Sequence, residues 1–197
     1  QALNNPKRGA IQQLSKQWRQ LVSEVEAAIQ QKLSPDNPDV WALAWRWVQQ
    51  VIAVTNNSAA LAGKLKVLQE HEQRAQEILG IGPGMLKWIG QAIAHARIAL
   101  VAKYLSPEQT AEVRRRQLAT MAHMDQWPEL VALVREQMTA GVSSQAKPMR
   151  VLARRWNQLF CDAYGGNDQA LEAKVRQAFA LEPKLSLGVG VDRALMH

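Results

Sequence analysis

The spacing of apolar residues along the chain is typical of α-helices. Apolar side chains recur at intervals of three and four residues almost throughout, and alternating runs of β-branched residues are absent. Residues of high helix propensity, mainly Ala, Leu, Gln, Glu, Lys and Arg, dominate the composition. The sequence therefore predicts an all-α protein with no β-strand.

We expect roughly eight helices, separated by turns that proline, glycine or asparagine marks. The predicted helices cover residues 6–32, 38–54, 59–78, 83–105, 106–123 and 127–138, and two more begin near residues 148 and 169. Ser106-Pro107-Glu108-Gln109 has the form of a capping box with proline at the first helical position. The polar stretch 141–147 is the best candidate for a linker.

An internal repeat predicts two tandem, related helical subdomains. The segment 43–49, Leu-Ala-Trp-Arg-Trp-Val-Gln, matches the segment 152–158, Leu-Ala-Arg-Arg-Trp-Asn-Gln, and further matches follow up to residues 80–81 and 190–191. We expect residues 1–105 to hold an N-terminal helix and the first copy, 106–146 connecting helices and the linker, and 147–197 the second copy. The second copy stops early, and the chain has no initiator methionine, which favours a piece of a longer protein.

Residues that both copies share should serve the fold, whereas residues that differ are free for function. One face of the second predicted helix is apolar in both copies and predicts core: Leu43, Ala44, Trp47, Val51 and Val54. A neighbouring stripe has mostly polar counterparts in the second copy: Trp41, Trp45, Val48 and Ile52. This extra face, with Trp41 and Trp45, must cover the other subdomain, a symmetry partner or a flat apolar ligand.

Charge and cysteine content limit the kinds of partner and compartment that suit this protein. The chain has 24 basic and 17 acidic residues and therefore a net charge of +7. This positive charge makes nucleic acid or an anionic ligand a candidate partner. The single cysteine, Cys161, excludes a disulfide framework and a cysteine-rich zinc site and fits a reducing compartment. No apolar run approaches the roughly 20 residues that span a bilayer, and no export signal is visible. We expect a cytoplasmic protein with no membrane partner.

Catalytic and nucleotide-binding motifs are missing from the sequence. His71-Glu72-Gln73-Arg74 lacks the second histidine of a zinc-protease helix. The glycines of residues 80–84 follow no strand and precede no Lys-Ser/Thr pair, which favours a structural turn. The arginine runs 114–116 and 154–155 lack a helix-turn-helix signature and are predicted to be solvated. We therefore predict a protein that is not an enzyme and uses neither a metal nor a cofactor.

The second copy contains four short motifs: Leu-Ala-Arg-Arg-Trp-Asn-Gln-Leu-Phe at 152–160, Tyr-Gly-Gly at 164–166, Glu-Pro-Lys-Leu at 182–185 and Gly-Val-Gly-Val at 188–191. These motifs resemble the TipA-type antibiotic-recognition domain, which is found at the C-terminus of some MerR-family regulators. The duplicated arrangement is similar to that of the albicidin-binding proteins. Ala-Lys-Tyr-Leu at 102–105 and Trp-Pro-Glu-Leu-Val at 127–131 contribute to this likeness.

The resemblance implies a non-enzymatic, all-α receptor that wraps a large aromatic or peptide antibiotic in a groove or tunnel between helices. In a MerR-type regulator, binding would be transmitted to a DNA-binding domain that these residues do not include. By this likeness the tunnel would be lined by Lys66, Gln69, Val101, Tyr104, Phe160, Ala163 and Tyr164. Seven tryptophans offer stacking surfaces for such a ligand. The alternative is a helical dimerisation or adaptor module without a ligand, and a homodimer is compatible with either.

Overall fold

The chain folds into two groups of helices joined by one long helix. The computed structural model describes residues 6–58, 60–61, 64–65, 73–120 and 126–188. Every regular element within these residues is helical, which confirms the all-α prediction. The first group contains α1 (Pro6–Gln30), the short turn η1 (Pro38–Val40), α2 (Trp41–Thr55), α4 (Gln73–Leu79) and the start of α5 (Met85–Ala102).

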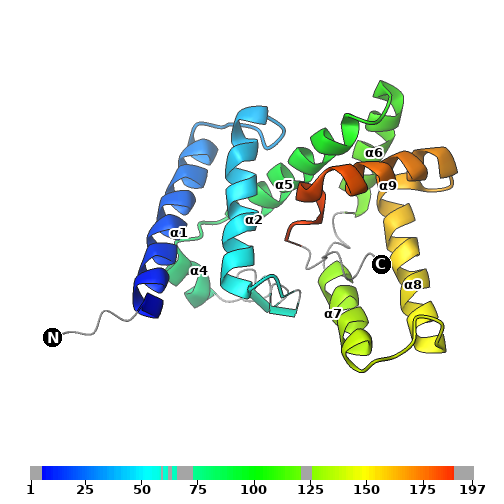
Figure 1. The fold of residues 1–197 in the computed structure, drawn as a ribbon. Coiled ribbons are helices and arrows are strands. Elements are labelled where there is room, and N and C mark those ends of the chain that lie inside the picture. The colour runs from blue at the N-terminus through cyan, green and yellow to red at the C-terminus, as the bar shows by residue number, and fades with distance from the viewer. Residues whose placement is uncertain (1–5, 59, 62–63, 66–72, 121–125, 189–197) are drawn as a thin grey trace.

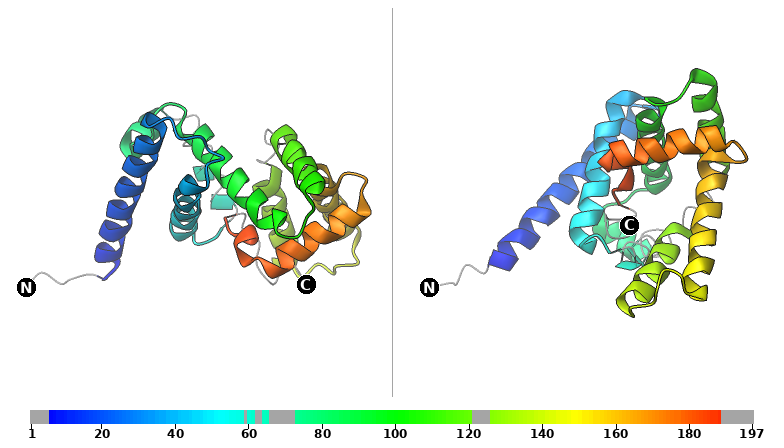
Figure 2. Two further views of the ribbon diagram at one scale, coloured as in Figure 1. Left: turned by 90° about the horizontal axis from the view of Figure 1, so that it is seen from above. Right: turned by 45° about the vertical axis from the view of Figure 1, so that its right-hand side comes forward.

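The second group begins where α5 ends. It contains α6 (Pro107–Thr120), α7 (Gln126–Thr139), α8 (Lys147–Phe160), the π-helical turn η3 (Cys161–Gly165), α9 (Gln169–Leu181) and the 3-10 turn η4 (Pro183–Ser186). The first group lies at one end of the molecule, with α6 to α9 at the other end (Figure 1). A second view shows α5 running from one group to the other (Figure 2).

Several helix ends follow directly from local sequence. The capping box is confirmed, because the Gln109 backbone N–H donates to Ser106 Oγ at 3.2 Å and the Ser106 backbone N–H donates to Gln109 Oε1 at 3.1 Å. Asn56 ends α2 in the left-handed region with φ 49°, a conformation that asparagine tolerates better than most residues. The capping chemistry thus fixes the start of α6 and the end of α2.

The first core forms where α1, α2 and the first turns of α5 meet. Buried members include Leu21, Val25, Ala44, Trp47 and Ile89, and the Trp18 and Trp47 rings lie 4.6 Å apart between centroids. The predicted core position of Val54 is wrong, because its side chain is 60% exposed near the end of α2. Val54 is therefore not part of this core, although the next residue, Thr55, is buried.

A second core fills the space between α5, α6, α9 and η3. Its buried members include Val101, Val113, Phe160, Leu171 and Val175. Val101 belongs to α5, so this helix contributes side chains to both cores. Since α5 contacts α1 and α2 near its start and α6, α9 and η4 further along, it fixes how the two groups sit relative to each other.

Candidate functional site

The two halves meet around Arg97, a residue of α5 that is only 9% exposed. Its Nη2 donates a hydrogen bond of 2.6 Å to the Leu187 carbonyl oxygen, just beyond η4. Gly188 follows with φ +79°, and a Cβ at that position would come within 2.8 Å of Val48 Cγ1 on α2. Three elements, α2, α5 and the segment after η4, therefore converge on this buried guanidinium.

The two tryptophans of the predicted extra face on α2 lie in different places. Trp41 packs against the first core, whereas Trp45 lies where the two halves meet. Trp41 is half-buried against the first core, and its buried indole Nε1 has no hydrogen-bond partner among the described residues. Trp45 is half-buried, and Lys184 of η4 places its Nζ 5.9 Å from the Trp45 ring centroid. Trp45 therefore faces the second half, beside Val48 on the same side of the helix.

Four residues expected to line a tunnel come together in the second core. Val101, Phe160, Ala163 and Tyr164 are all buried there. The centroid of the Phe160 ring lies 5.0 Å from that of Tyr164 and 5.8 Å from that of Phe179, and the guanidinium carbon of Arg176 lies 4.3 Å from the same centroid. These side chains contact one another closely, so their first role is to hold α5, α8 and α9 together.

Tyr104, the fifth such residue, lies at the rim of this cluster. Its hydroxyl donates to Glu182 Oε1 at 3.3 Å, and Lys103 Nζ donates to the same oxygen at 2.7 Å. Partial burial, together with the Glu182 carboxylate, raises the pKa of the Tyr104 hydroxyl. Tyr104 therefore remains a neutral hydrogen-bond donor at neutral pH, close to the junction of the halves.

A π-helical turn underlies the second cluster. Residues Cys161–Gly165 form η3, and the buried Gln117 of α6 donates from Nε2 to the Ala163 carbonyl oxygen at 3.2 Å. Single π-turns inside helices are often found at functional sites because they redirect side chains. A pocket of about 310 Å³ opens beside this turn, and its lining includes Thr120, Trp127, Arg155, Leu159, Asp162 and Ala163.

The family model of the TipAS antibiotic-recognition domain matches residues 1–96. These residues belong to that family. The match extends from the N-terminus through α1 and α2 to Ala96 of α5, so it includes Trp41 and Trp45 and ends one residue before Arg97. No curated protein matches the chain significantly.

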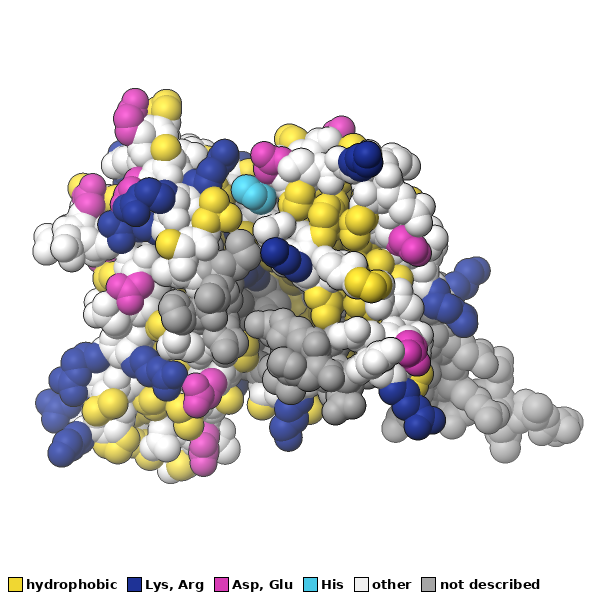
Figure 3. Space-filling model, turned by 180° about the vertical axis from the view of Figure 1, so that it is seen from behind, with side chains coloured by type: hydrophobic (Ala, Val, Ile, Leu, Met, Phe, Trp, Pro, Cys, Tyr) yellow, Lys and Arg dark blue, Asp and Glu magenta, His cyan; other side chains and the backbone are white. Residues whose placement is uncertain are grey.

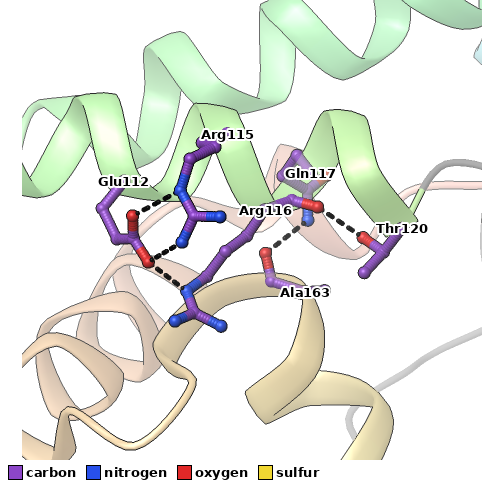
Figure 4. A network of polar contacts seen from close by, with 6 residues as sticks. All are labelled: Glu112, Arg115, Arg116, Gln117, Thr120 and Ala163. Carbon is purple, nitrogen blue, oxygen red and sulfur yellow. Dashed lines mark hydrogen bonds and ion pairs between the residues drawn. The ribbon is translucent and has the colours of Figure 1, made fainter.

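Arg115 and Arg116 of α6 are paired with an acidic residue and do not form a free arginine patch. Figure 4 shows Arg115 and Arg116 both turned toward Glu112, with Nη2 of Arg115 2.7 Å and Nε of Arg116 2.6 Å from Glu112 Oε1. On the face drawn in Figure 3, several Lys and Arg side chains gather at the lower left, and the others lie apart among Asp and Glu. This arrangement agrees with the expectation that the arginine run is a solvated face.

Within the part of the chain that the structure describes, no group of three or more His, Cys, Asp and Glu side chains is placed to hold a metal ion. None of the helices described here has the length and apolar character needed to cross a bilayer.

Sequence patterns identified some residues of the candidate site but not others. Lys66 and Gln69 lie outside the described residues. Arg97 was missed, although a single charged residue within the otherwise apolar stretch 96–102 is a usable signal. The contribution of Gly188 was also missed, because nothing local to residue 188 reveals that α2 packs against it.

We expect Cys161 to react slowly with alkylating agents. Burial raises the pKa of the thiol, and Glu172 raises it further by accepting the Sγ–H hydrogen bond at 3.3 Å. Since the thiolate is the nucleophile, the folded protein should react with iodoacetamide at pH 8 more slowly than the urea-unfolded chain. Cys161 is the only cysteine, so intact mass reports this one site.

Glu172→Gln should speed this alkylation several-fold, because the substitution removes the negative charge that opposes thiolate formation. Asp162→Asn serves as the matched control, since Asp162 has the smallest influence on the Cys161 pKa. Equal rates for Glu172→Gln and the unsubstituted protein would show that Glu172 does not restrain the thiol.

Proposed function

We propose that this chain is a non-enzymatic antibiotic-binding protein that takes a large aromatic or peptide antibiotic into a groove between its two helical halves. The match of residues 1–96 to an antibiotic-recognition domain carries the proposal. The matched segment contains Trp45 but not Trp127. We therefore place the ligand against α2 and α5 rather than in the pocket beside α7.

The junction has the chemistry that such a ligand needs. Trp45 offers a half-buried aromatic surface, and Tyr104 offers a neutral hydroxyl at the end of α5. Binding sites for small molecules favour places between packed units, where apolar walls combine with a few polar groups.

The same proposal covers two biological uses of binding. The protein sequesters the antibiotic, or, as part of a MerR-type regulator, it transmits binding to a DNA-binding domain outside these residues. Both uses belong to the cytoplasm, where a single unpaired cysteine such as Cys161 stays reduced.

Tryptophan fluorescence tests the proposal directly. The purified chain is titrated with a panel of aromatic oligoamide and thiopeptide antibiotics, and we expect saturable quenching by at least one member at micromolar or tighter affinity. Trp45→Ala should weaken that affinity by about tenfold or more, the usual effect of removing a central tryptophan contact. Trp127→Ala is the matched control and should leave the affinity unchanged.

Three outcomes would contradict parts of this proposal. Flat titrations across the panel would favour the dimerisation or adaptor module, which sedimentation analysis then tests. Affinity lost in Trp127→Ala but kept in Trp45→Ala would move the ligand to the pocket beside α7. Loss in both variants, with native circular dichroism spectra, would show that the ligand spans both places.

A further inference from the structure

The outward face of α8 carries a row of exposed cations. Lys147, Arg150 and Arg154 are all exposed, and they fall within about 60° of one another on a helix that turns ~100° per residue. The row extends over about 10 Å, because each helical residue adds ~1.5 Å. No acidic residue occurs between positions 147 and 160. In Figure 3, Lys and Arg side chains gather at the lower left, over the end of the molecule where α7 and α8 lie.

The adjacent residues Arg154 and Arg155 have different roles. Arg155 turns toward α7, where its Nη2 lies 3.0 Å from Oε2 of Glu129. Arg154 is rotated from Arg155 by ~100° around the helix axis and is exposed. The arginine pair therefore supplies one cation to the contact with α7 and one to the exposed row.

The cations of the row do not stabilise α8. Lys147 and Arg150 stand in its first turn, which contains no acidic residue, and positive charges at this end oppose the helix dipole. Like charges three and four residues apart on one helix also repel each other. The helix packs through its opposite side, where the Trp156 and Trp127 ring centroids lie 5.1 Å apart. An anionic partner on the exposed row would relieve both electrostatic costs.

The chemistry of this face favours a nucleic acid over a protein or a membrane as the partner. Val151, which is 48% exposed, adds only a small apolar area to the row. Protein interfaces have an apolar centre, and helices that bind membranes insert an apolar face into the lipid. Protein–DNA interfaces are more polar and more positively charged than protein–protein interfaces.

The geometry favours a double strand. Proteins that bind single strands stack bases on exposed aromatic rings, but Trp156 lies on the side of α8 opposite the row and packs against Trp127. Each strand of duplex DNA presents one phosphate per ~3.4 Å along the axis. A row of about 10 Å therefore matches about three phosphates.

We propose that the α8 basic row, Lys147, Arg150 and Arg154, contacts the phosphate backbone of duplex DNA without reading its bases. This inference goes beyond antibiotic binding and does not depend on it. Each side chain contacts one phosphate, and the release of counterions drives binding. Arg155 keeps its ion pair with Glu129.

Fluorescence anisotropy of a labelled duplex of about 20 base pairs tests the proposal, with an expected dissociation constant of ~1–100 µM at low salt. Three phosphate contacts should make the affinity fall about 40-fold when the KCl concentration rises fourfold, from about 20 to about 80 mM. Absence of binding at the lower salt concentration, or an affinity that does not change with salt, would overturn the proposal.

Two neighbouring single variants locate the contact. Arg154→Gln should weaken binding about three- to tenfold and reduce the slope of log affinity against log salt by about 0.9. Arg155→Gln is the matched control, because it removes the same charge one position away, and it should leave the slope unchanged. Equal slopes for the two variants would overturn the assignment to the exposed row.

Two triple variants separate the row from net charge. Replacing all three cations of the α8 basic row by glutamine should weaken binding at least about tenfold. The control Lys16→Gln/Arg19→Gln/Lys87→Gln removes the same net charge from exposed positions of α1 and α5, and it should keep the affinity within about twofold. Melting temperatures equal to that of the unsubstituted protein verify that both variants are folded.

Two further outcomes would contradict the proposal. Equal losses in the two triple variants would mean that net charge alone attracts the duplex. If polyglutamate bound more tightly than the duplex at the same salt concentration, the row would belong to an acidic protein partner instead of DNA.

Discussion

Replacing Phe160 by alanine should lower the free energy of unfolding by ~3–5 kcal/mol, the range for truncating a buried phenylalanine. The ring is 6% exposed and lies between Tyr164, Phe179 and the Arg176 guanidinium. Its loss leaves a cavity at the end of α8, beside the π-helical turn, where few neighbours can move in. Urea unfolding followed by circular dichroism measures the change.

Phe160→Leu is the matched control, and it should cost less than about 1.5 kcal/mol because it stays apolar and fills most of the space. The pair of variants also separates two roles for this residue, which the family resemblance places in the ligand tunnel. If Phe160→Ala kept its stability but lost antibiotic affinity, the ring would line the site instead of the core.

Local patterns predicted the helices well because helix formation is decided over a few residues. The capping box at Ser106 and the left-handed turn at Asn56 depend on side chains within three positions of the helix end. The π-helical turn at Cys161–Gly165 was not visible, since its backbone depends on contacts with α6 and α9. Val54 fits the apolar period of α2, yet its side chain is mostly exposed.

The candidate site was harder to predict than the helices because it joins distant segments. The likeness to TipA-type domains selected Val101, Phe160, Ala163 and Tyr164, and the structure gathers them into one cluster. Whether they also contact a ligand stays a prediction. Arg97 matters at the junction because it donates a hydrogen bond to the Leu187 carbonyl oxygen, 90 positions away. The periodicity of the sequence does not reveal such a distant pairing. The division of the chain at residue 105 likewise stays a prediction, and α5 contributes to both cores.

Gly188→Ala should destabilise the protein by about 2–4 kcal/mol, because two costs act together at the junction. Alanine at φ +79° is strained, and its Cβ would lie 2.8 Å from Val48 Cγ1, closer than side-chain carbons approach. The backbone must move away from α2, which also shifts the Leu187 carbonyl that accepts the Arg97 hydrogen bond. Thermal and urea unfolding measure the loss.

Gly141→Ala separates the two costs. Gly141 has a similar φ of +69°, but a Cβ there would meet nothing within 4 Å, so only the backbone strain of about 1–2 kcal/mol applies. The excess loss in Gly188→Ala measures how tightly α2 packs against the segment after η4. If both variants lost the same stability, the two halves would be only loosely joined near Val48.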